Sequence, residues 1–240
     1  MTEKQLTILQ LYPKDMNIYG DWGNVLTVMR RAQWHGYEVN LMEYNPGDTF
    51  PDTIDIVLGG GGQDSGQDRI QQDLLKIGST LHKLANKRTP MLFICGLYQQ
   101  LGNSFKTQDG HIIEGIGIFN METIAGPERL TGNIVTKSDE FGTIIGYENH
   151  SGQTTLHRDT QPLATVIKGA GNNSTDGTEG ARYKNVIGSY LHGSLLPKNP
   201  RIADFLIETA AVNKYGSFTP GIIDDRFAES ARFTAESRPR

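Results

Sequence analysis

The sequence predicts an α/β fold in which a mainly parallel central sheet carries flanking helices and added antiparallel strands. In the first half of the chain, short apolar runs alternate with stretches of helical periodicity, a pattern typical of parallel strands joined by helices. One run, residues 91–94, is wholly apolar, as expected of a strand buried on both faces. The second half is rich in Gly, Thr and Asn and holds short β-type runs, which favours antiparallel strands and loops.

Four strands are expected in the first half, at residues 6–11, 38–44, 54–58 and 91–94. A helix is expected over residues 24–35, because apolar side chains recur there at helical spacing: Val25, Val28, Met29 and Ala32. A longer helix is expected over residues 70–84, where one face is marked by Ile70, Leu74, Ile77, Leu81 and Leu84. Ligands bind such sheets outside the carboxyl ends of the strands, so the residues that directly follow the strands are candidates for a site.

The second half offers a β-type run at residues 142–147, an apolar strand at residues 186–191 and a helix that opens at Asn199 or Pro200. Neither an internal repeat nor a Pro-rich linker divides the chain. We therefore expect one domain over residues 1–216. A charged C-terminal tail, residues 217–240, follows it and is expected to be loose or to dock on a partner.

Composition excludes several classes of protein. The net charge of -4 argues against a broad nucleic-acid surface. A single cysteine cannot form an internal disulfide, so a reducing cytoplasm is the natural setting. The polar N-terminal segment lacks the apolar core of a signal peptide, and no apolar stretch approaches the ~20 residues of a membrane span. We expect a cytoplasmic protein that reaches the inner face of the membrane only through a partner or a lipid headgroup.

The single cysteine, Cys95, directly follows the buried run 91–94 and precedes Gly96 and an amphipathic stretch. This order fits a tight strand-to-helix turn, which holds a nucleophile exposed above the sheet beside free backbone N–H groups. A helix N-terminus also lowers the pKa of a thiol. The plainer interpretation is that Cys95 is a small buried hydrophobic residue.

Four consecutive glycines, residues 59–62, follow the third expected strand. Without Cβ atoms, their N–H groups can approach a ligand closely. They do not form a phosphate loop, because no Lys-Ser or Lys-Thr follows and the first strand lacks Gly-x-Gly-x-x-Gly. An ATP site would therefore lie elsewhere or on another chain. The alternatives are a flexible loop, or an oxyanion hole that pairs one of these N–H groups with that of the residue after Cys95.

Among the six histidines, His192 closes the apolar run 186–191 and is therefore expected at the same sheet edge as Cys95. A cysteine and a histidine brought close in space make a nucleophile and its base; the alternative is a strand-end histidine bonded to a loop carbonyl. His150 is a second candidate for the rim of the site, whereas His35 and His82 fall in expected helices and are expected at the surface. The chain has one cysteine and no histidine pair at helical i, i+4 spacing, which argues against a metal site.

Two segments carry a family resemblance: Ile94-Cys95-Gly96-Leu97-Tyr98-Gln99-Gln100-Leu101-Gly102 and Gly188-Ser189-Tyr190-Leu191-His192-Gly193. They resemble the class I, triad-type glutamine amidotransferases, and within them the cobyric acid synthase (CobB/CobQ) branch. Residues 59–64, 129–133, 146–150 and 195–200 are similar to the glutaminase subunits of lipid II isoglutaminyl synthases. The resemblance spans roughly residues 7–216 and implies the class I glutamine-amidotransferase fold.

The sequence departs from the pattern of the class in two places. Class I elbows usually read Gly-x-Cys-x-Gly, whereas Phe93 and Leu97 fill the outer positions here. The broader class also carries a glutamate two residues after its histidine, where this chain has Ser194. The acid that orients the imidazole is therefore missing from its usual place.

The resemblance implies that Cys95 attacks the side-chain amide of L-glutamine while His192 acts as general base and then as general acid. The N–H of Gly96 and one from Gly60 or Gly61 would hold the oxyanion. An arginine that matches Arg129 holds the glutamine in the family, in keeping with bidentate recognition of its α-carboxylate. Further residues are expected at the rim of the site: Gln63, Gln99 and His150.

The resemblance also implies a partner, because released ammonia is used by a synthetase. That partner would be a separate Mur-ligase-like subunit that binds ATP and Mg and activates the D-glutamate α-carboxylate of lipid II, which ammonia converts to D-isoglutamine. No cofactor is expected in this chain. Two alternatives stay open at this point: an amidotransferase or cysteine hydrolase of another pathway, such as cobyrinic acid amidation, and a non-catalytic binding protein with a reactive thiol.

Overall fold

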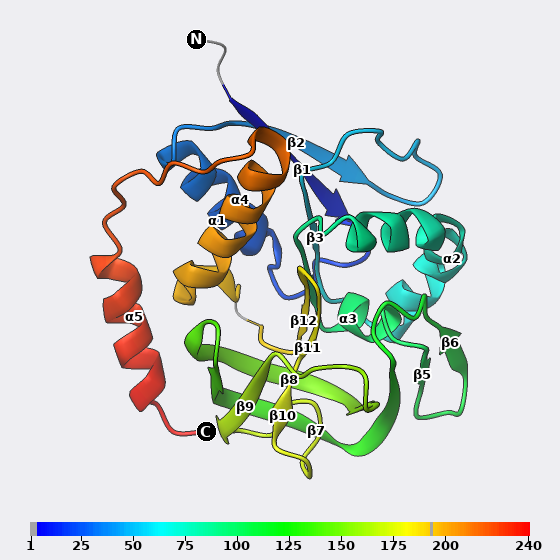
Figure 1. Cartoon of the computed structure of the whole chain (residues 1–240). Coiled ribbons are helices and arrows are strands. Elements are labelled where there is room, and N and C mark those ends of the chain that lie inside the picture. The colour runs from blue at the N-terminus through cyan, green and yellow to red at the C-terminus, as the bar shows by residue number, and fades with distance from the viewer. Residues whose placement is uncertain (1–3, 193) are drawn as a thin grey trace.

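The computed structural model describes residues 4–192 and 194–240, so that Gly193 of the Tyr-Leu-His-Gly segment lies outside the described residues. Its central sheet has the strand order β11-β12-β4-β3-β1-β2 (Figure 1). Five strands run parallel: β1 (Gln5–Leu11), β2 (Glu38–Tyr44), β3 (Ile56–Gly59), β4 (Met91–Ile94) and β12 (Val186–Ser189). Strand β11 (Ala181–Tyr183) adds an antiparallel edge. The expected mainly parallel sheet is confirmed.

Helices cover both faces of this sheet. In Figure 1, α1 (Trp22–Trp34) and α4 (Pro200–Tyr215) lie on one side, and α2 (Asp64–Asn86) and the short α3 (Gly96–Gln100) lie on the other. The face predicted for α2 does point into the core, where four of its five apolar residues are buried: Ile70, Leu74, Ile77 and Leu81. Within residues 4–192 and 194–240, no helix combines the length and the apolar character that crossing a bilayer requires.

The expected antiparallel strands do not extend the central sheet but form a second one, with the order β10-β9-β7-β5-β6 and β8 paired to β7. Its long hairpin is β7 (Met121–Ser138) and β8 (Gly142–Leu156). The shorter strands are β5 (Ser104–Lys106), β6 (Ile112–Glu114), β9 (Ala164–Lys168) and β10 (Thr178–Glu179). All pairs are antiparallel except β5 with β7. One cluster of buried hydrophobic residues includes members from both sheets.

The C-terminal tail forms a helix, α5 (Arg226–Ser237), which lies along the outside of the molecule (Figure 1). Arg31 of α1 pairs at 2.6 Å with both Asp204 of α4 and Asp225, the residue before α5. Arg232 of α5 donates to the carbonyl oxygens of Lys198, in the 3-10 turn η1 (Leu196–Lys198), and of Thr143. Polar contacts of buried or half-buried arginines therefore hold the tail on the domain.

The prediction that His35 and His82 lie at the surface is wrong. Only 5% of the His35 side chain is exposed, and its ring nitrogens contact Asp204 Oδ1 at 3.2 Å and the Gly221 N–H at 2.9 Å. His82 is half-buried, with Nε2 2.6 Å from the carbonyl oxygen of Ile116. Distant segments cover both rings, and helical periodicity within α1 and α2 carries no information about those segments.

Strand register places three chain segments at one edge of the central sheet. Gly59 of β3 is the partner of Phe93 in β4, and Ile94 of β4 is the partner of Ser189 in β12. The Cys95 N–H donates to the Ser189 carbonyl oxygen at 2.9 Å. The glycine run, Cys95 and the segment that leads to His192 therefore emerge side by side.

Replacement of Gly188 by alanine tests this packing. A Cβ at Gly188 would lie 2.1 Å from Tyr98 Cδ2 and 2.9 Å from Phe119 Cε2, and both rings are fully buried. We expect Gly188→Ala to lower the free energy of unfolding by about 1–3 kcal/mol or more, measured by urea denaturation. Gly126→Ala is the matched control, because the atoms nearest to its Cβ would belong to the flexible side chain of Gln153; equal losses in the two variants would contradict this account.

Candidate active site

Cys95 occupies a strained turn between β4 and α3. Its backbone has φ 50° and ψ -102°, a region that costs a residue with a Cβ on the order of 1–3 kcal/mol and persists only where the surroundings impose it. The space at the next position favours glycine, because a Cβ on Gly96 would lie 2.8 Å from Met16 Cε and 3.1 Å from the Gly62 nitrogen. The strand, sharp turn and helix of a nucleophile elbow are therefore present.

The bulky outer residues of this elbow are accommodated by Gly59. A Cβ at Gly59 would lie 2.4 Å from Leu97 Cδ1 and 2.9 Å from Phe93 Cδ1. The absence of a side chain on β3 therefore supplies the space that glycines supply at the outer positions of the usual motif. The turn keeps its geometry despite the departure from Gly-x-Cys-x-Gly.

His192 follows β12 and is brought to Cys95 by the second sheet. Its backbone forms an antiparallel bridge with Tyr147 of β8, in which the His192 N–H donates to the Tyr147 carbonyl oxygen at 2.7 Å. A Cβ at Gly61 would lie 3.1 Å from Cys95 Cβ and 3.1 Å from His192 Cε1. The cysteine and the histidine therefore both border the backbone of Gly61, although no hydrogen bond joins them in this conformation.

The imidazole of His192 is buried and lacks an orienting acid among residues 4–192 and 194–240, where neither ring nitrogen finds a hydrogen-bond partner. The imidazole packs against the ring of Tyr19, and the two ring centroids lie 4.4 Å apart. Ser194, at the position of the missing glutamate, donates through Oγ to the Gly20 carbonyl oxygen at 2.9 Å. A serine there is engaged with the loop before α1.

Burial keeps both reacting groups neutral in this state. The pKa of Cys95 is raised to about 12, first by burial and then by the carboxylate of Asp21, whereas Arg129 and the Gly96 N–H act in the opposite direction. Burial lowers the pKa of His192 to about 3, and His150 and Arg129 add to this effect. At neutral pH the pair is a thiol and a neutral imidazole, which can accept the thiol proton when substrate arrives.

The two N–H groups expected to hold the oxyanion, those of Gly96 and Gly61, differ in where they point. The Gly96 N–H lies near the Cys95 thiol and acts to lower its pKa, which is the side on which an oxyanion donor is expected. The Gly61 N–H instead donates to Asp21 Oδ2 at 2.7 Å, and the Gly60 carbonyl oxygen accepts from the Leu97 N–H at 3.4 Å. In this conformation the donor predicted at Gly61 is therefore occupied by a buried carboxylate.

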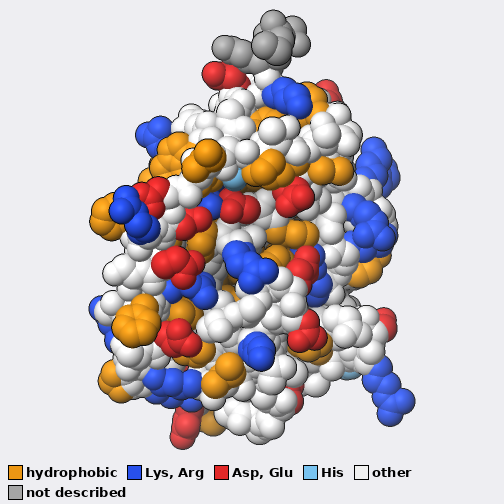
Figure 2. Space-filling model, turned by 60° about the vertical axis from the view of Figure 1, so that its left-hand side comes forward, with side chains coloured by type: hydrophobic (Ala, Val, Ile, Leu, Met, Phe, Trp, Pro, Cys, Tyr) orange, Lys and Arg blue, Asp and Glu red, His pale blue; other side chains and the backbone are white. Residues whose placement is uncertain are grey.

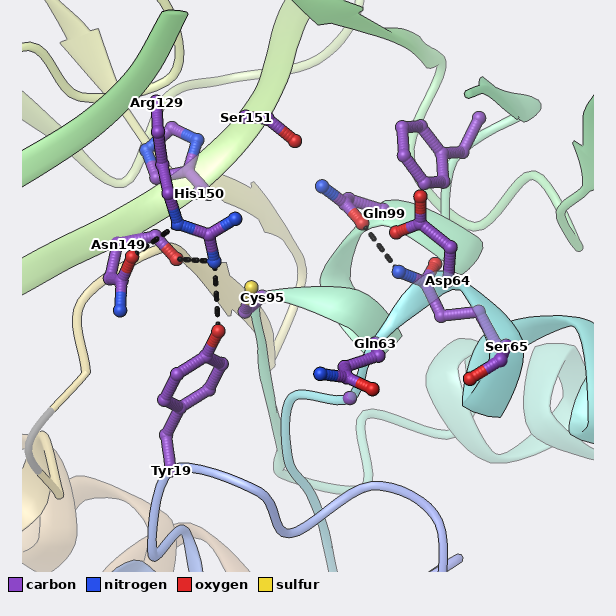
Figure 3. A pocket seen from close by; sticks show the side chains of 13 residues that line it. Tyr19, Gln63, Asp64, Ser65, Cys95, Gln99, Arg129, Asn149, His150 and Ser151 are labelled. Carbon is purple, nitrogen blue, oxygen red and sulfur yellow. Dashed lines mark hydrogen bonds between the residues drawn. The ribbon is translucent and has the colours of Figure 1, made fainter. Parts of the chain in front are cut away.

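A cavity of about 370 Å³ opens over Cys95, and Arg129 projects into it from β7 (Figure 3). Arg129 Nε donates to Asn149 Oδ1 at 2.5 Å, and Nη2 donates to the Tyr19 hydroxyl at 2.9 Å. Arg129 belongs to an irregularity of β7, where the pairing with β8 shifts between Ala125 and Leu130. The bulge aims a guanidinium at the nucleophile, as bulges beside active sites commonly do.

The residues predicted at the rim do line this cavity: Gln63, Gln99 and His150. Gln99 is buried and fixed, because its Oε1 accepts from Gln67 at 3.0 Å and its Nε2 donates to the Tyr190 hydroxyl at 3.1 Å. His150 stacks on Tyr190 with centroids 3.6 Å apart, and burial lowers its pKa to about 4. Gln63 is exposed at the start of α2.

Sequence reasoning missed three residues of the site: Tyr19, Asp21 and Asn149. Tyr19 and Asp21 belong to the segment between β1 and α1, which has neither strand nor helix periodicity and gave no local signal. Asn149 lies within the segment 146–150 that carries the family resemblance, and its adjacency to His150 was the available clue.

The chain matches known proteins along most of its length. Residues 7–200 match the CobB/CobQ-like glutamine amidotransferase domain. The chain is 43% identical over 223 residues to the Staphylococcus aureus lipid II isoglutaminyl synthase (glutamine-hydrolyzing) subunit GatD, covering 92% of this chain and 90% of that protein. The Streptococcus pneumoniae subunit of the same name is 38% identical, with 88% and 83% covered.

A solved structure shares the fold. The structure described as PurLQS from Thermotoga maritima superposes with a TM-score of 0.58 at 14% sequence identity, covering 88% of this chain and 99% of that one. At this identity the likeness concerns the fold alone.

The raised pKa of Cys95 predicts how the free chain reacts with iodoacetamide. Because the thiolate is the nucleophile and the pKa lies near 12, we expect alkylation between pH 7 and 9 to accelerate about tenfold per pH unit without a plateau. Mass spectrometry of the alkylated chain measures the rate. The chain unfolded in urea is the control, since its thiol should titrate near pH ~8.5; a plateau below pH 8 in the folded chain would show a resident thiolate instead.

Proposed function

The chain belongs to the CobB/CobQ-like glutamine amidotransferase family, and we propose that it is the glutaminase subunit of a lipid II isoglutaminyl synthase. The observation that carries the proposal is the joint placement of three residues: Cys95 lies on a strained elbow, His192 lies beside it against Gly61, and Arg129 lines the cavity that opens over Cys95. Each comes from a different element, so their convergence is a property of the fold rather than of one motif.

In the proposed reaction, Cys95 Sγ attacks the side-chain amide carbon of L-glutamine while His192 accepts the thiol proton. The protonated imidazole then gives that proton to the departing nitrogen, which leaves as ammonia, and a thioester remains. Water activated by the neutral imidazole attacks the thioester, releases glutamate and restores the thiol. The low pKa of His192 leaves its imidazole unprotonated before the reaction begins, so that it is free to accept the thiol proton.

Arg129 is proposed to bind the α-carboxylate of glutamine. Its guanidinium is held by Asn149 and Tyr19 through Nε and Nη2, which fixes its plane over the cavity. A carboxylate could then meet a preorganised donor pair after displacing one of these contacts. This geometry would hold the substrate amide at the level of Cys95.

The ammonia is proposed to serve a separate Mur-ligase-like subunit that binds ATP and Mg, works on lipid II at the inner face of the membrane and lies with this chain in the cytoplasm. The subunit names of the two relatives support a partner. We further propose that this partner supplies a carboxylate to His192, because the described residues leave both imidazole nitrogens unpaired and Ser194 stands where an acid is usual.

The tail is proposed to form part of the contact with the partner. On α5, Phe227 is 84% exposed and Phe233 is 78% exposed. The face that includes α5 mixes hydrophobic with charged side chains (Figure 2). Apolar rings held in water on a helix fixed to the domain are typical of an interaction surface.

Substitution of the three residues tests the glutaminase proposal. We expect Cys95→Ala and His192→Ala each to reduce glutamine-dependent ammonia release by at least about a thousandfold. Arg129→Lys should raise KM more than it lowers kcat, because the charge persists but the fork is lost. His111→Ala, an exposed histidine away from the cavity, is the control.

Two results would contradict that proposal. Full activity in Cys95→Ala would exclude the nucleophile, and a glutamine-mimicking electrophile that failed to label Cys95 would favour a hydrolase of another amide. Amidation of a cobyrinic acid by the complex, in place of lipid II, would move the chain to the other pathway.

Assembly with the synthetase should accelerate glutamine hydrolysis well above the rate of the free chain. We expect Phe227→Ser with Phe233→Ser to weaken co-purification and to abolish that acceleration, while the free-chain rate stays unchanged. Ile112→Ser is the matched control, since Ile112 is 55% exposed on β6, away from the tail. A free chain as fast as the complex would refute the idea that the partner completes the site.

A further inference from the structure

Asp21 stands at the N-cap of α1 but does not cap that helix. Aspartate is among the preferred N-cap residues because its carboxylate accepts from the first free N–H groups, yet no such side-chain bond is made here. The side chain is only 4% exposed, and its Oδ2 accepts instead from the Gly61 N–H at 2.7 Å. Its Oδ1 has no partner among residues 4–192 and 194–240. The one hydrogen bond of this buried carboxylate is therefore made to the glycine run.

The peptide that Asp21 binds is the one that borders the reacting pair. Its carbonyl oxygen, on Gly60, points to the elbow and accepts from the Leu97 N–H at 3.4 Å. Its N–H, on Gly61, points to Asp21. The oxyanion that forms when Cys95 attacks an amide needs an N–H on the elbow side, where this conformation presents a carbonyl oxygen.

The backbone of this peptide offers no steric barrier to a turnover, so the bond to Asp21 is what opposes it. A turnover changes ψ of Gly60 and φ of Gly61, and neither residue has a Cβ to oppose it. The turned peptide would direct the Gly61 N–H to the elbow and the Gly60 carbonyl to Asp21. Burial raises the pKa of Asp21 to about 6, so a protonated carboxyl that donates to that carbonyl is within reach.

We propose that Asp21 is a positioning residue that holds the Gly60–Gly61 peptide with its N–H away from Cys95, so that the second oxyanion donor appears only when this peptide turns over. The inference rests on the proposed glutaminase function and deepens it. The free chain then lacks the Gly61 donor, and its glutamine turnover is slow until the bond between Asp21 and Gly61 is broken.

A second effect of Asp21 must be separated from this one. Its carboxylate also raises the pKa of Cys95, so its removal favours the thiolate regardless of the peptide. Two probes respond differently. Alkylation by iodoacetamide depends on the thiolate and forms no oxyanion, whereas a glutamine analogue with an aldehyde in place of its amide adds to the thiol and does form one.

The experiment compares the free wild-type chain with Asp21→Ala. Removal of one oxyanion donor typically costs about 10²–10³ in kcat. We therefore expect Asp21→Ala to raise kcat for glutamine at least about tenfold with little change in KM, and to tighten aldehyde binding at least about tenfold more than it speeds alkylation. The charge control is Asp64→Asn, because Asp64 also raises the Cys95 pKa but makes no bond to Gly61; its two probes should change together.

Asp21→Asn guards against misfolding of the alanine variant, since an amide can serve the peptide in either orientation. The kcat and the aldehyde affinity of Asp21→Asn should fall between those of the wild type and of Asp21→Ala. The rate of hydrogen exchange at the Gly61 amide should follow the same order. Equal changes in alkylation and aldehyde binding would reduce Asp21 to a charge effect and overturn the proposal. A loss of aldehyde affinity in well-folded variants would also overturn it, by showing that the observed conformation is the productive one.

Failure of the proposed function shows itself differently. A wild-type chain that hydrolyses no glutamine, alone or in complex, overturns that function and this inference together. An active chain with an unchanged ratio of the two probes overturns only the role of Asp21.

Discussion

Strand β4 is hydrogen-bonded in parallel to β3 on one side and to β12 on the other, so three chain segments end at one edge of the sheet. This pairing places three groups at that edge: the thiol, the glycine run and the imidazole. A register slip of one residue in any of the three strands would turn alternate side chains to the opposite face. Strand β4 is fully apolar and buried on both sides, so the chemically active side chains come from the turns that follow the strands.

The second sheet completes what the first cannot. Strand β8 fixes the His192 backbone through Tyr147 and contributes His150 and Asn149 to the site, while the irregular part of β7 brings Arg129 over the cavity. The resulting enclosure is dry enough to hold thiol and imidazole neutral. A low dielectric strengthens the electrostatic interactions of any charge that later develops there. The reacting pair is thus in place but neutral in the resting site.

Much of this arrangement follows from local pattern. The apolar run before Cys95, the α2 face and the alternation of strands and helices are encoded by neighbouring residues, so the parallel sheet and the meeting of Cys95 with His192 were predictable. The unpredicted features depend on distant segments. Tyr19 and Asp21 come from a loop without periodicity, and the donor at Gly61 is engaged by a residue forty positions earlier. His35 is covered by α4 and the tail, which no pattern within α1 announces.

The burial of Cys95 affects how readily its thiol is oxidised. Peroxides oxidise thiolates and reach exposed sulfur far faster than buried thiols. A neutral thiol on a residue that is only 6% exposed is therefore sheltered from sulfenic acid formation while the site is empty. The thiolate that peroxides oxidise forms only during turnover, when substrate binds and the thiol proton is transferred. The same enclosure that slows the first proton transfer gives the idle protein its resistance to oxidants.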